Sequence, residues 1–329
     1  MKTTVLLTIM MLALSCSQQK EHTYKNPLTG VSLPDPSIIK SDDGYFYLYA
    51  TEDIRNTPIF RSKNLTDWHH IGECFTKETR PSWGSEEAGI WAPDINHING
   101  KYVLYYTHAA PYCHETCGIG VAISDSPCGP FTDLGPLIQS DSIGVKNSID
   151  QFYIEDSGKK YLIFGSFEGI YIIELTSDGL ALQEGSEKEQ IVGGGYEASN
   201  ILKKGKHYYY FSSIDGCCAG SESTYKISVG RSDNLFGPYL NKSGESMMNF
   251  RPNVILHGDS IFAGPGHNSE IITDDSGDDW LLYHSFIKSS PEKGRVLCLD
   301  KIVWKEEWPE IEGSVPSKES RVPVFMNDK

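Results

Sequence analysis

Positive charge is scarce in this chain of 329 residues, which carries 29 Lys and Arg against 44 Asp and Glu, a formal net charge of −15. A protein that binds nucleic acid needs clustered Lys and Arg to neutralise the phosphates. We therefore expect no nucleic-acid partner. Among polysaccharides, the same composition disfavours an anionic polymer relative to a neutral one as a ligand.

Long apolar runs and long helical periodicity are also lacking. The apolar stretch at residues 5–14, which follows Lys2, is too short to cross a bilayer and has the pattern of an export signal. We predict that residues 1–15 are a signal peptide and that the protein is exported.

The sequence Ala-Leu-Ser-Cys at residues 13–16 resembles the lipobox of bacterial lipoproteins, although its leucine stands one place late. It predicts a lipid on Cys16, a tether at residues 16–25, and a periplasmic or cell-surface lipoprotein that meets the membrane only through this anchor. The alternative is an ordinary signal peptide cleaved near Ser15, with Cys16 incidental.

Aromatic residues, by contrast, are abundant, with 18 Tyr, 13 Phe and 6 Trp, and they favour β-strands. Five segments of the chain share one pattern, in which an ionisable residue, a short apolar strand, a turn glycine and an aromatic strand follow one another. The turn glycines are Gly44, Gly100, Gly158, Gly205 and Gly277. They recur about every 58 residues, and β-units with a period of this size predict an all-β, five-bladed β-propeller.

The ionisable residues that open the five segments carry the chemistry. They are Asp35, Asp94, Asp150, Glu197 and His267. If each segment begins the innermost strand of a blade, four carboxylates and one imidazole meet at one end of the central channel. Carboxylates that share a site raise one another's pKa, so that one stays protonated near neutral pH. The alternative is that these residues only solubilise strand ends or cap hairpins.

Such a division of protonation states suits the hydrolysis of glycosides, in which one carboxylic acid protonates the leaving oxygen and another carboxylate activates water or attacks the sugar. The chain also resembles glycoside hydrolase family 43 from about residue 26 to residue 316. The resemblance rests on Leu-Pro-Asp-Pro-Ser at 33–37, Ile-Trp-Ala-Pro-Asp-Ile at 90–95, Ser-Ile-Asp at 148–150, Tyr-Glu-Ala-Ser at 196–199 and Gly-Pro-Gly-His-Asn at 264–268. We assign residues 26–316 to the catalytic propeller and residues 317–329 to a C-terminal tail.

The resemblance implies a five-bladed propeller that hydrolyses with inversion, and it implies a role for each of three carboxylates. Asp35 is the expected general base, Glu197 the expected general acid, and Asp150 the third carboxylate that tunes the pKa of the acid and orients it. An inverting enzyme keeps its acid and its base about 6.5–9.5 Å apart, to leave room for water. We expect that separation between Asp35 and Glu197.

Further residues also match the family. Trp91, Asp94 and His267 resemble substrate-binding residues, and His267 also resembles an axial histidine that in some members approaches a central calcium or other ion through water. We therefore expect no obligatory cofactor, with calcium as the candidate ion. Two positions depart from the family pattern: Gln151 stands where proline is usual, and Ala198 stands where glycine is commoner.

The substrate expected from the resemblance is a neutral, arabinose-containing plant cell-wall glycan, cleaved by an α-L-arabinofuranosidase or arabinanase that acts as a monomer. The stretches at 264–268 and 295–304 resemble arabinan-active members. A β-xylosidase and a galactan-directed exo-glycosidase are alternatives within the family. A non-catalytic, glycan-binding surface propeller is an alternative of another class, which the presence of both Asp35 and Glu197 disfavours.

Two cysteines, Cys217 and Cys218, are adjacent in the sequence. We expect them to mark a tight turn rather than a redox centre.

Overall fold

The computed structural model describes four stretches of the chain, residues 22–51, 56–84, 88–110 and 116–326. The predicted signal peptide, the lipidation at Cys16 and most of the predicted tether concern residues outside this part. Within it, the helices are short, and none has the length and apolar character needed to span a membrane.

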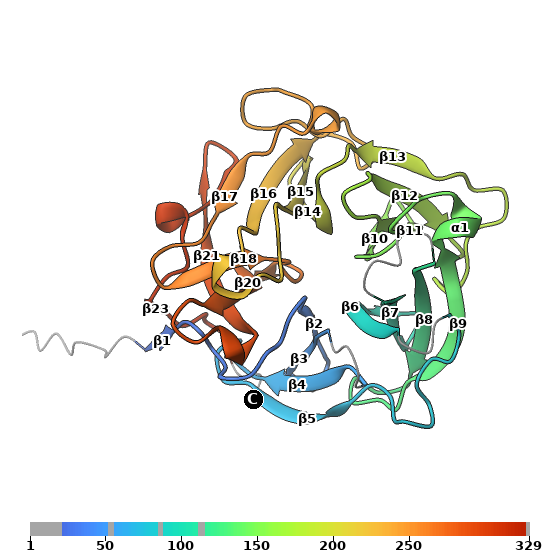
Figure 1. Ribbon diagram of the computed structural model, residues 1–329, viewed down its shortest axis with the longest axis horizontal. Coiled ribbons are helices and arrows are strands. Elements are labelled where there is room, and N and C mark those ends of the chain that lie inside the picture. The colour runs from blue at the N-terminus through green and yellow to red at the C-terminus, as the bar shows by residue number, and fades with distance from the viewer. Residues whose placement is uncertain (1–21, 52–55, 85–87, 111–115, 327–329) are drawn as a thin grey trace, which may run out of the picture.

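Five antiparallel sheets of the described residues stand around a central axis as the blades of a propeller (Figure 1). This arrangement confirms the predicted fold. In each blade, consecutive strands are neighbours, and the first strand lies nearest the axis. The strands of the first three blades are β2 (Ser37–Lys40), β3 (Phe46–Tyr49), β4 (Pro58–Ser62) and β5 (His69–Glu73); β6 (Gly89–Ile98), β7 (Lys101–Ala109), β8 (Gly118–Ser124) and β9 (Thr132–Gln139); and β10 (Phe152–Asp156), β11 (Lys159–Phe164), β12 (Ile170–Leu175) and β13 (Glu189–Val192).

The fifth blade differs from the others because its inner strand is divided. The pieces β18 and β19 both pair with β20, and residues 267–271 pass between them without strand structure. The strands of the last two blades are β14 (Glu197–Lys204), β15 (His207–Ile214), β16 (Lys226–Ser232) and β17 (Val254–Leu256); and β18 (Phe262–Gly266), β19 (Ile272–Thr273), β20 (Asp279–Ile287), β21 (Arg295–Lys305) and β22 (Trp308–Ile311).

The predicted hairpin turns join the first two strands of the blades. The five turn glycines have φ values between 62° and 83°. This left-handed conformation costs glycine little, because it has no Cβ. The prediction of glycine turns is therefore confirmed.

The hydrophobic core consists of layers between neighbouring blades, because side chains of a strand alternate between its two faces. In β3, Tyr47 and Tyr49 pack toward the second blade, whereas Phe46 and Leu48 pack toward the fifth. Both faces of the aromatic strands are thus buried. This explains why these strands read as nearly continuous aromatic and aliphatic runs.

The two ends of the folded domain pair with each other. Strand β1 (Thr23–Lys25) is antiparallel to β23 (Glu319–Arg321), and the amide of Asn26 donates to the carbonyl oxygens of Leu299 and Ser317. The domain is therefore larger than the predicted range of 26–316. Residues 23–25, which we assigned to the tether, and residues 319–321, which we assigned to the tail, close the ring, because each end supplies the other with a strand partner.

Candidate active site

Each blade contributes one residue in the left-handed conformation where its inner strand begins or breaks, and these residues set the true register of the repeat. Their φ values lie between 39° and 57°, and they are Asp35, Ala92, Asp150, Ala198 and His267. The register that we predicted from ionisable residues is therefore wrong in two blades. Asp94 stands two residues after its blade's left-handed residue, and Glu197 stands one residue before. The positive φ of Ala198 also explains why glycine suits this position.

A side chain of the preceding blade holds the backbone N–H of four of these residues. The pairs are Asp35 with His284 Nδ1 (3.1 Å), Ala92 with Thr51 Oγ1 (2.7 Å), Asp150 with Thr107 Oγ1 (3.1 Å) and His267 with Ser213 Oγ (2.8 Å). In the fourth blade, the N–H of Ala198 instead donates to Asp150 Oδ2 at 3.1 Å. Non-glycine residues keep a positive φ only where their surroundings impose it, and these bonds impose it here.

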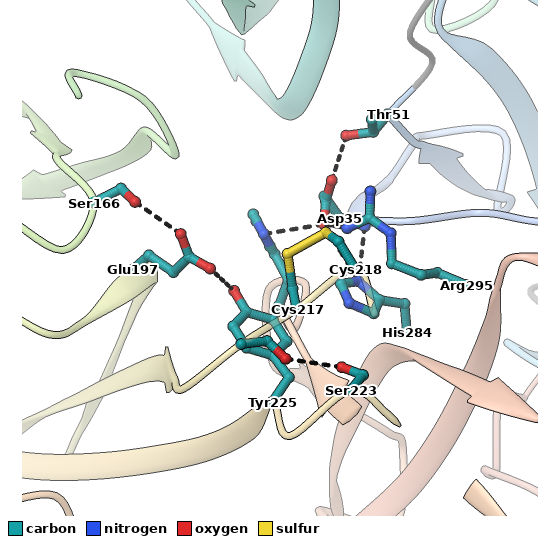
Figure 2. The surroundings of a disulfide bond; sticks show 12 residues. Asp35, Thr51, Ser166, Glu197, Cys217, Cys218, Ser223, Tyr225, His284 and Arg295 are labelled. Atoms are coloured by element: carbon teal, nitrogen blue, oxygen red, sulfur yellow. Dashed lines mark hydrogen bonds and ion pairs between the residues drawn. A yellow bond between two sulfur atoms is a disulfide. The ribbon is translucent and has the colours of Figure 1, made fainter. Parts of the chain in front are cut away.

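Asp35 is buried and ionised. Arg295 Nη1 lies 2.7 Å from Asp35 Oδ1, and Thr51 Oγ1 donates to Oδ2 at 2.6 Å (Figure 2). His267 Nδ1 lies 3.3 Å from Oδ1. Burial opposes ionisation, but the positive charges of Arg295 and His267 outweigh it and hold the pKa of Asp35 well below its usual value.

Two histidines at Asp35 have opposite protonation tendencies. Burial lowers the pKa of His284 to about 4, and the charge of Arg295 opposes its protonation, so its neutral Nδ1 accepts the N–H of Asp35. Burial also disfavours the charged form of His267, but the carboxylates of Asp35 and Asp150 outweigh burial and raise its pKa. His267 thus adds positive charge beside Asp35, whereas His284 orients the backbone.

Glu197 is buried as well, but its pKa moves in the other direction. Ser166 Oγ donates to Oε2 at 2.7 Å, and Tyr225 OH donates to Oε1 at 2.5 Å, from opposite sides of the carboxyl group (Figure 2). Burial and the charge of Asp150 raise the pKa of Glu197 to about 7, more than these two bonds lower it. Glu197 is therefore fixed by its neighbours and still holds a proton near neutral pH.

The contacts of Asp150 connect it with the surroundings of both other carboxylates. Its Oδ2 accepts the N–H of Ala198, next to Glu197, and lies 4.0 Å from His267 Nδ1. Burial and the charge of Asp35 raise its pKa, although His267 opposes this. The three carboxyl groups thus differ in the direction of their shifts: the pKa of Asp35 is lowered, whereas the pKa values of Asp150 and Glu197 are raised. This is the division that acid and base catalysis at one site requires.

The structure does not bring Asp94 to this group. Its Oδ2 accepts the N–H of Tyr153 at 2.7 Å, and burial together with the charge of Glu270 raises its pKa well above the usual value. Glu270 in turn accepts bonds from Ser37 Oγ and the N–H of Ile38, both at 2.7 Å. The predicted meeting of four carboxylates is therefore wrong: three meet, and Asp94 forms a separate acidic pair with Glu270. The role of Asp94 toward substrate stays a prediction.

Trp91 occupies the same repeat position in the second blade as Glu197 in the fourth, one residue before the left-handed residue. Its side chain is partly exposed, and its indole Nε1 has no hydrogen-bond partner among the described residues. The Nε1 atom itself is buried, so the part of the side chain that a ligand can reach is the apolar ring, which suits a ligand with an apolar face, such as a sugar.

Gln151, which stands where proline is usual in the family that the chain resembles, has a structural role. Its Oε1 accepts from Thr107 Oγ1 at 3.0 Å, and its amide donates to the carbonyl oxygen of Ala92. Gln151 therefore joins the second and third blades beside Asp150, where a proline would offer no such side-chain bond.

Our reasoning from the sequence missed the residues that position the carboxylates. Those that contact Asp35 or Glu197 are Thr51, Ser166, Tyr225, His284 and Arg295. One signal was present: Thr107, Ser213 and His284 stand in the second half of an aromatic strand, and Thr51 and Ser166 stand two residues beyond the end of one. The repeat thus carries a polar position at this point.

Cys217 and Cys218 form a disulfide in the loop at 215–224, between β15 and β16. The loop begins just after Ser213, which holds His267, and ends before Tyr225, which binds Glu197. Figure 2 shows the disulfide together with Glu197 and Asp35. The disulfide joins two consecutive residues, so it constrains the backbone of one turn in a loop whose two ends belong to the site.

A five-bladed propeller whose axis holds carboxyl groups of divided pKa has the equipment of a glycoside-hydrolysing enzyme. The family model of glycosyl hydrolases family 43 matches residues 24–309. The chain belongs to this family, and it is thus a hydrolase of glycosidic bonds.

Two relatives of known name match over most of their length. The extracellular endo-α-(1→5)-L-arabinanase 1 of Bacillus subtilis (strain 168) is 32% identical over 292 residues, which are 84% of this chain and 87% of the relative. The extracellular exo-α-(1→5)-L-arabinofuranosidase ArbA of Cellvibrio japonicus is 30% identical over 309 residues, which are 86% of this chain and 87% of the relative.

Solved structures of arabinanases are also similar to this chain. The α-L-arabinanase of Cellvibrio cellulosa, in complex with arabinohexaose, superposes with a TM-score of 0.77 at 29% identity, over 87% of this chain and 99% of that one. The family 43 endo-arabinanase of Bacillus licheniformis gives a TM-score of 0.74 at 30% identity, over 85% of this chain and 97% of that one.

Proposed function

We propose that this protein hydrolyses α-L-arabinosyl linkages of arabinan or its oligosaccharides with inversion, as an arabinanase or α-L-arabinofuranosidase. The observation that carries the proposal is the divided protonation of the site. Arg295 keeps Asp35 ionised, whereas burial and Asp150 keep a proton on Glu197 near neutral pH. The arabinan-directed activities of the named relatives support the choice of substrate.

Each carboxyl group has one task in the reaction. The oxygen of a water molecule attacks the anomeric carbon, and Asp35 takes the proton of that water. The bond to the leaving oxygen breaks while Glu197 gives that oxygen its proton. Asp150 keeps Glu197 protonated beforehand, and Trp91 offers its partly exposed ring to the sugar. The product sugar then has the inverted configuration, which proton NMR of the first product detects.

We further propose that the protein is exported, is anchored through a lipid on Cys16 and acts as a monomer. The two relatives named above are extracellular, which supports export. The anchor rests on the sequence at residues 13–16.

Calcium stays a prediction from the resemblance. The described residues contain no group of three His, Cys, Asp or Glu side chains that could hold a metal ion, and Nδ1 of His267 faces Asp35 and Asp150. These residues do not form a metal site by themselves. The reaction proposed above therefore has no step through a metal.

A panel of glycans tests the substrate. We expect arabinose or arabino-oligosaccharides from linear or branched arabinan, and the length of the products distinguishes exo from endo action. Xylose from xylo-oligosaccharides, or galactose from galactan, would keep the chemistry and contradict the substrate. Binding without release of any sugar would favour a glycan-binding propeller instead.

The pH profile tests the electrostatics with two variants of opposite sign. The charge of Asp150 raises the pKa of Glu197, whereas the bond from Tyr225 lowers it. The acid acts only while protonated, so activity falls as pH rises through its pKa. Asp150→Asn should move the alkaline limb of kcat/KM to lower pH by about one unit. Tyr225→Phe should move this limb to higher pH. Limbs that stay in place in both variants, or that move together, would contradict the assignment of Glu197.

A further inference from the structure

Three residues with large, exposed apolar side chains lie against the segment that leads from β13 into Glu197, two of them through their backbone and one through its ring. Phe167 is 43% exposed, Met248 42% and Phe250 41%. Phe167 lies between β11 and β12, and the other two lie in the loop between β16 and β17. Apolar side chains that a fold brings together at its surface beside a catalytic group indicate a binding surface.

The segment at 193–195 is glycine because these residues approach it closely. A Cβ at any of its positions would come within 2.7 Å of one of them. The contacts would be Gly193 with Met248 O (2.2 Å), Gly194 with Phe167 O (2.7 Å) and Gly195 with the ring of Phe250 (2.5 Å). The three glycines therefore allow a close approach that any side chain at these positions would prevent.

Both phenylalanines hold a strained backbone. Phe167 has φ = 56° and Phe250 has φ = 48°, values that are rare for bulky residues. Hydrogen bonds fix Phe167, whose N–H donates to Tyr196 O and whose carbonyl oxygen accepts from Gly195, both at 2.8 Å. The ring of Phe250 lies 5.2 Å from the ring of Tyr196. Strain that the surroundings impose on exposed aromatic residues points to a function for their position.

Phe167 is placed on one particular side of the acid by its neighbour in the sequence, and Phe250 packs against Gly195 and Tyr196, which precede the acid. Phe167 directly follows Ser166, whose hydroxyl donates to Glu197 Oε2. Figure 2 shows Ser166 on the side of Glu197 that faces away from Asp35. In an inverting reaction the base and its water approach the anomeric carbon from one side, and the leaving group departs beside the acid.

We propose that Phe167 and Phe250 bind the sugar of the leaving group, the unit of the neutral glycan that departs with the proton of Glu197. This inference rests on the proposed function. The apolar C–H face of a sugar ring packs well on an aromatic ring. A phenyl ring is uncharged, so no charged group loses its hydration when a neutral glycan binds there.

The double variant Phe167→Ala/Phe250→Ala tests this on the panel glycan from which the wild type releases sugar. We expect kcat/KM to fall about tenfold or more, mainly through KM, because each ring contributes on the order of 1 kcal/mol. The melting temperature and the alkaline limb of the pH profile should stay in place, because Glu197 keeps its own partners. Phe167→Tyr/Phe250→Tyr keeps both rings and should retain kcat/KM. Leu134→Ala, which removes an exposed apolar side chain in β9, is the matched control.

An active wild type with an unchanged kcat/KM in the double alanine variant overturns the inference. A displaced alkaline limb also overturns it, because the rings would then position the acid rather than bind sugar. If the double variant melts at a lower temperature, Phe167→Leu and Phe250→Leu take its place with the same criteria. A wild type that releases no sugar from any glycan would overturn the proposed function, and the inference with it.

Discussion

Replacing Glu197 with glutamine lowers kcat on arabinan by about 10²–10⁴-fold, the usual contribution of a positioned general acid. The amide keeps the shape of the side chain but has no acidic proton to give to the leaving oxygen. The loss should be much smaller on an aryl arabinofuranoside with an acidic phenol, because this leaving group departs without protonation. Steady-state rates on the two substrates measure the difference.

The control for this variant is Glu189→Gln, which neutralises an exposed carboxylate in β13 and should leave both rates unchanged. An equal loss on both substrates, with an unchanged melting temperature, would show that Glu197 serves another role than proton donation. Full activity on arabinan would remove Glu197 from the reaction altogether.

Replacing Asp35 with asparagine should lower kcat by about 10²–10⁴-fold on both substrates, because the base acts on water and a better leaving group cannot compensate for it. The acid limb of the pH profile should disappear as well, because it reports the ionisation of Asp35. The melting temperature should fall, since Arg295 Nη1 loses the carboxylate that lies 2.7 Å away.

Arg295→Gln separates these effects. It keeps the carboxylate of Asp35 but removes the charge that lowers its pKa, so the acid limb should move to higher pH while activity remains above that limb. A loss in Asp35→Asn that an activated leaving group repairs would contradict the assignment of Asp35 as the base.

The fold could be predicted from the sequence because its signals are local. A glycine turn and an aromatic strand recur in every blade, and each hairpin forms between residues that are close along the chain. The three carboxylates Asp35, Asp150 and Glu197 could be proposed because each stands beside the start of an inner strand.

The register of the repeat could not be read in the same way. The residues that share one conformation at the axis are Asp35, Ala92, Asp150, Ala198 and His267. They share no side-chain chemistry, because tertiary hydrogen bonds impose their backbone conformation. A comparison of residue types therefore chose Asp94 for the second blade and missed Ala92.

The electrostatics of the site depend on long-range closure of the ring. Asp35 and Arg295 are 260 residues apart in the sequence and meet because the first blade lies beside the fifth. Tyr225 reaches Glu197 across strands of the fourth blade, from the end of a loop that has no repeat signal. No local sequence pattern predicts such pairs. The opposite pKa shifts of Asp35 and Glu197 could therefore be inferred only from the three-dimensional structure.

The disulfide between Cys217 and Cys218 makes the finished site depend on where the chain folds. Disulfides form and persist in oxidising compartments, whereas cytosolic thiols are kept reduced. A chain retained in a reducing cytoplasm would keep Cys217 and Cys218 as thiols, without the small ring that constrains this turn of the loop between Ser213 and Tyr225. The loop that leads to Tyr225, the hydrogen-bond donor to Glu197, therefore gains this constraint only in an oxidising environment.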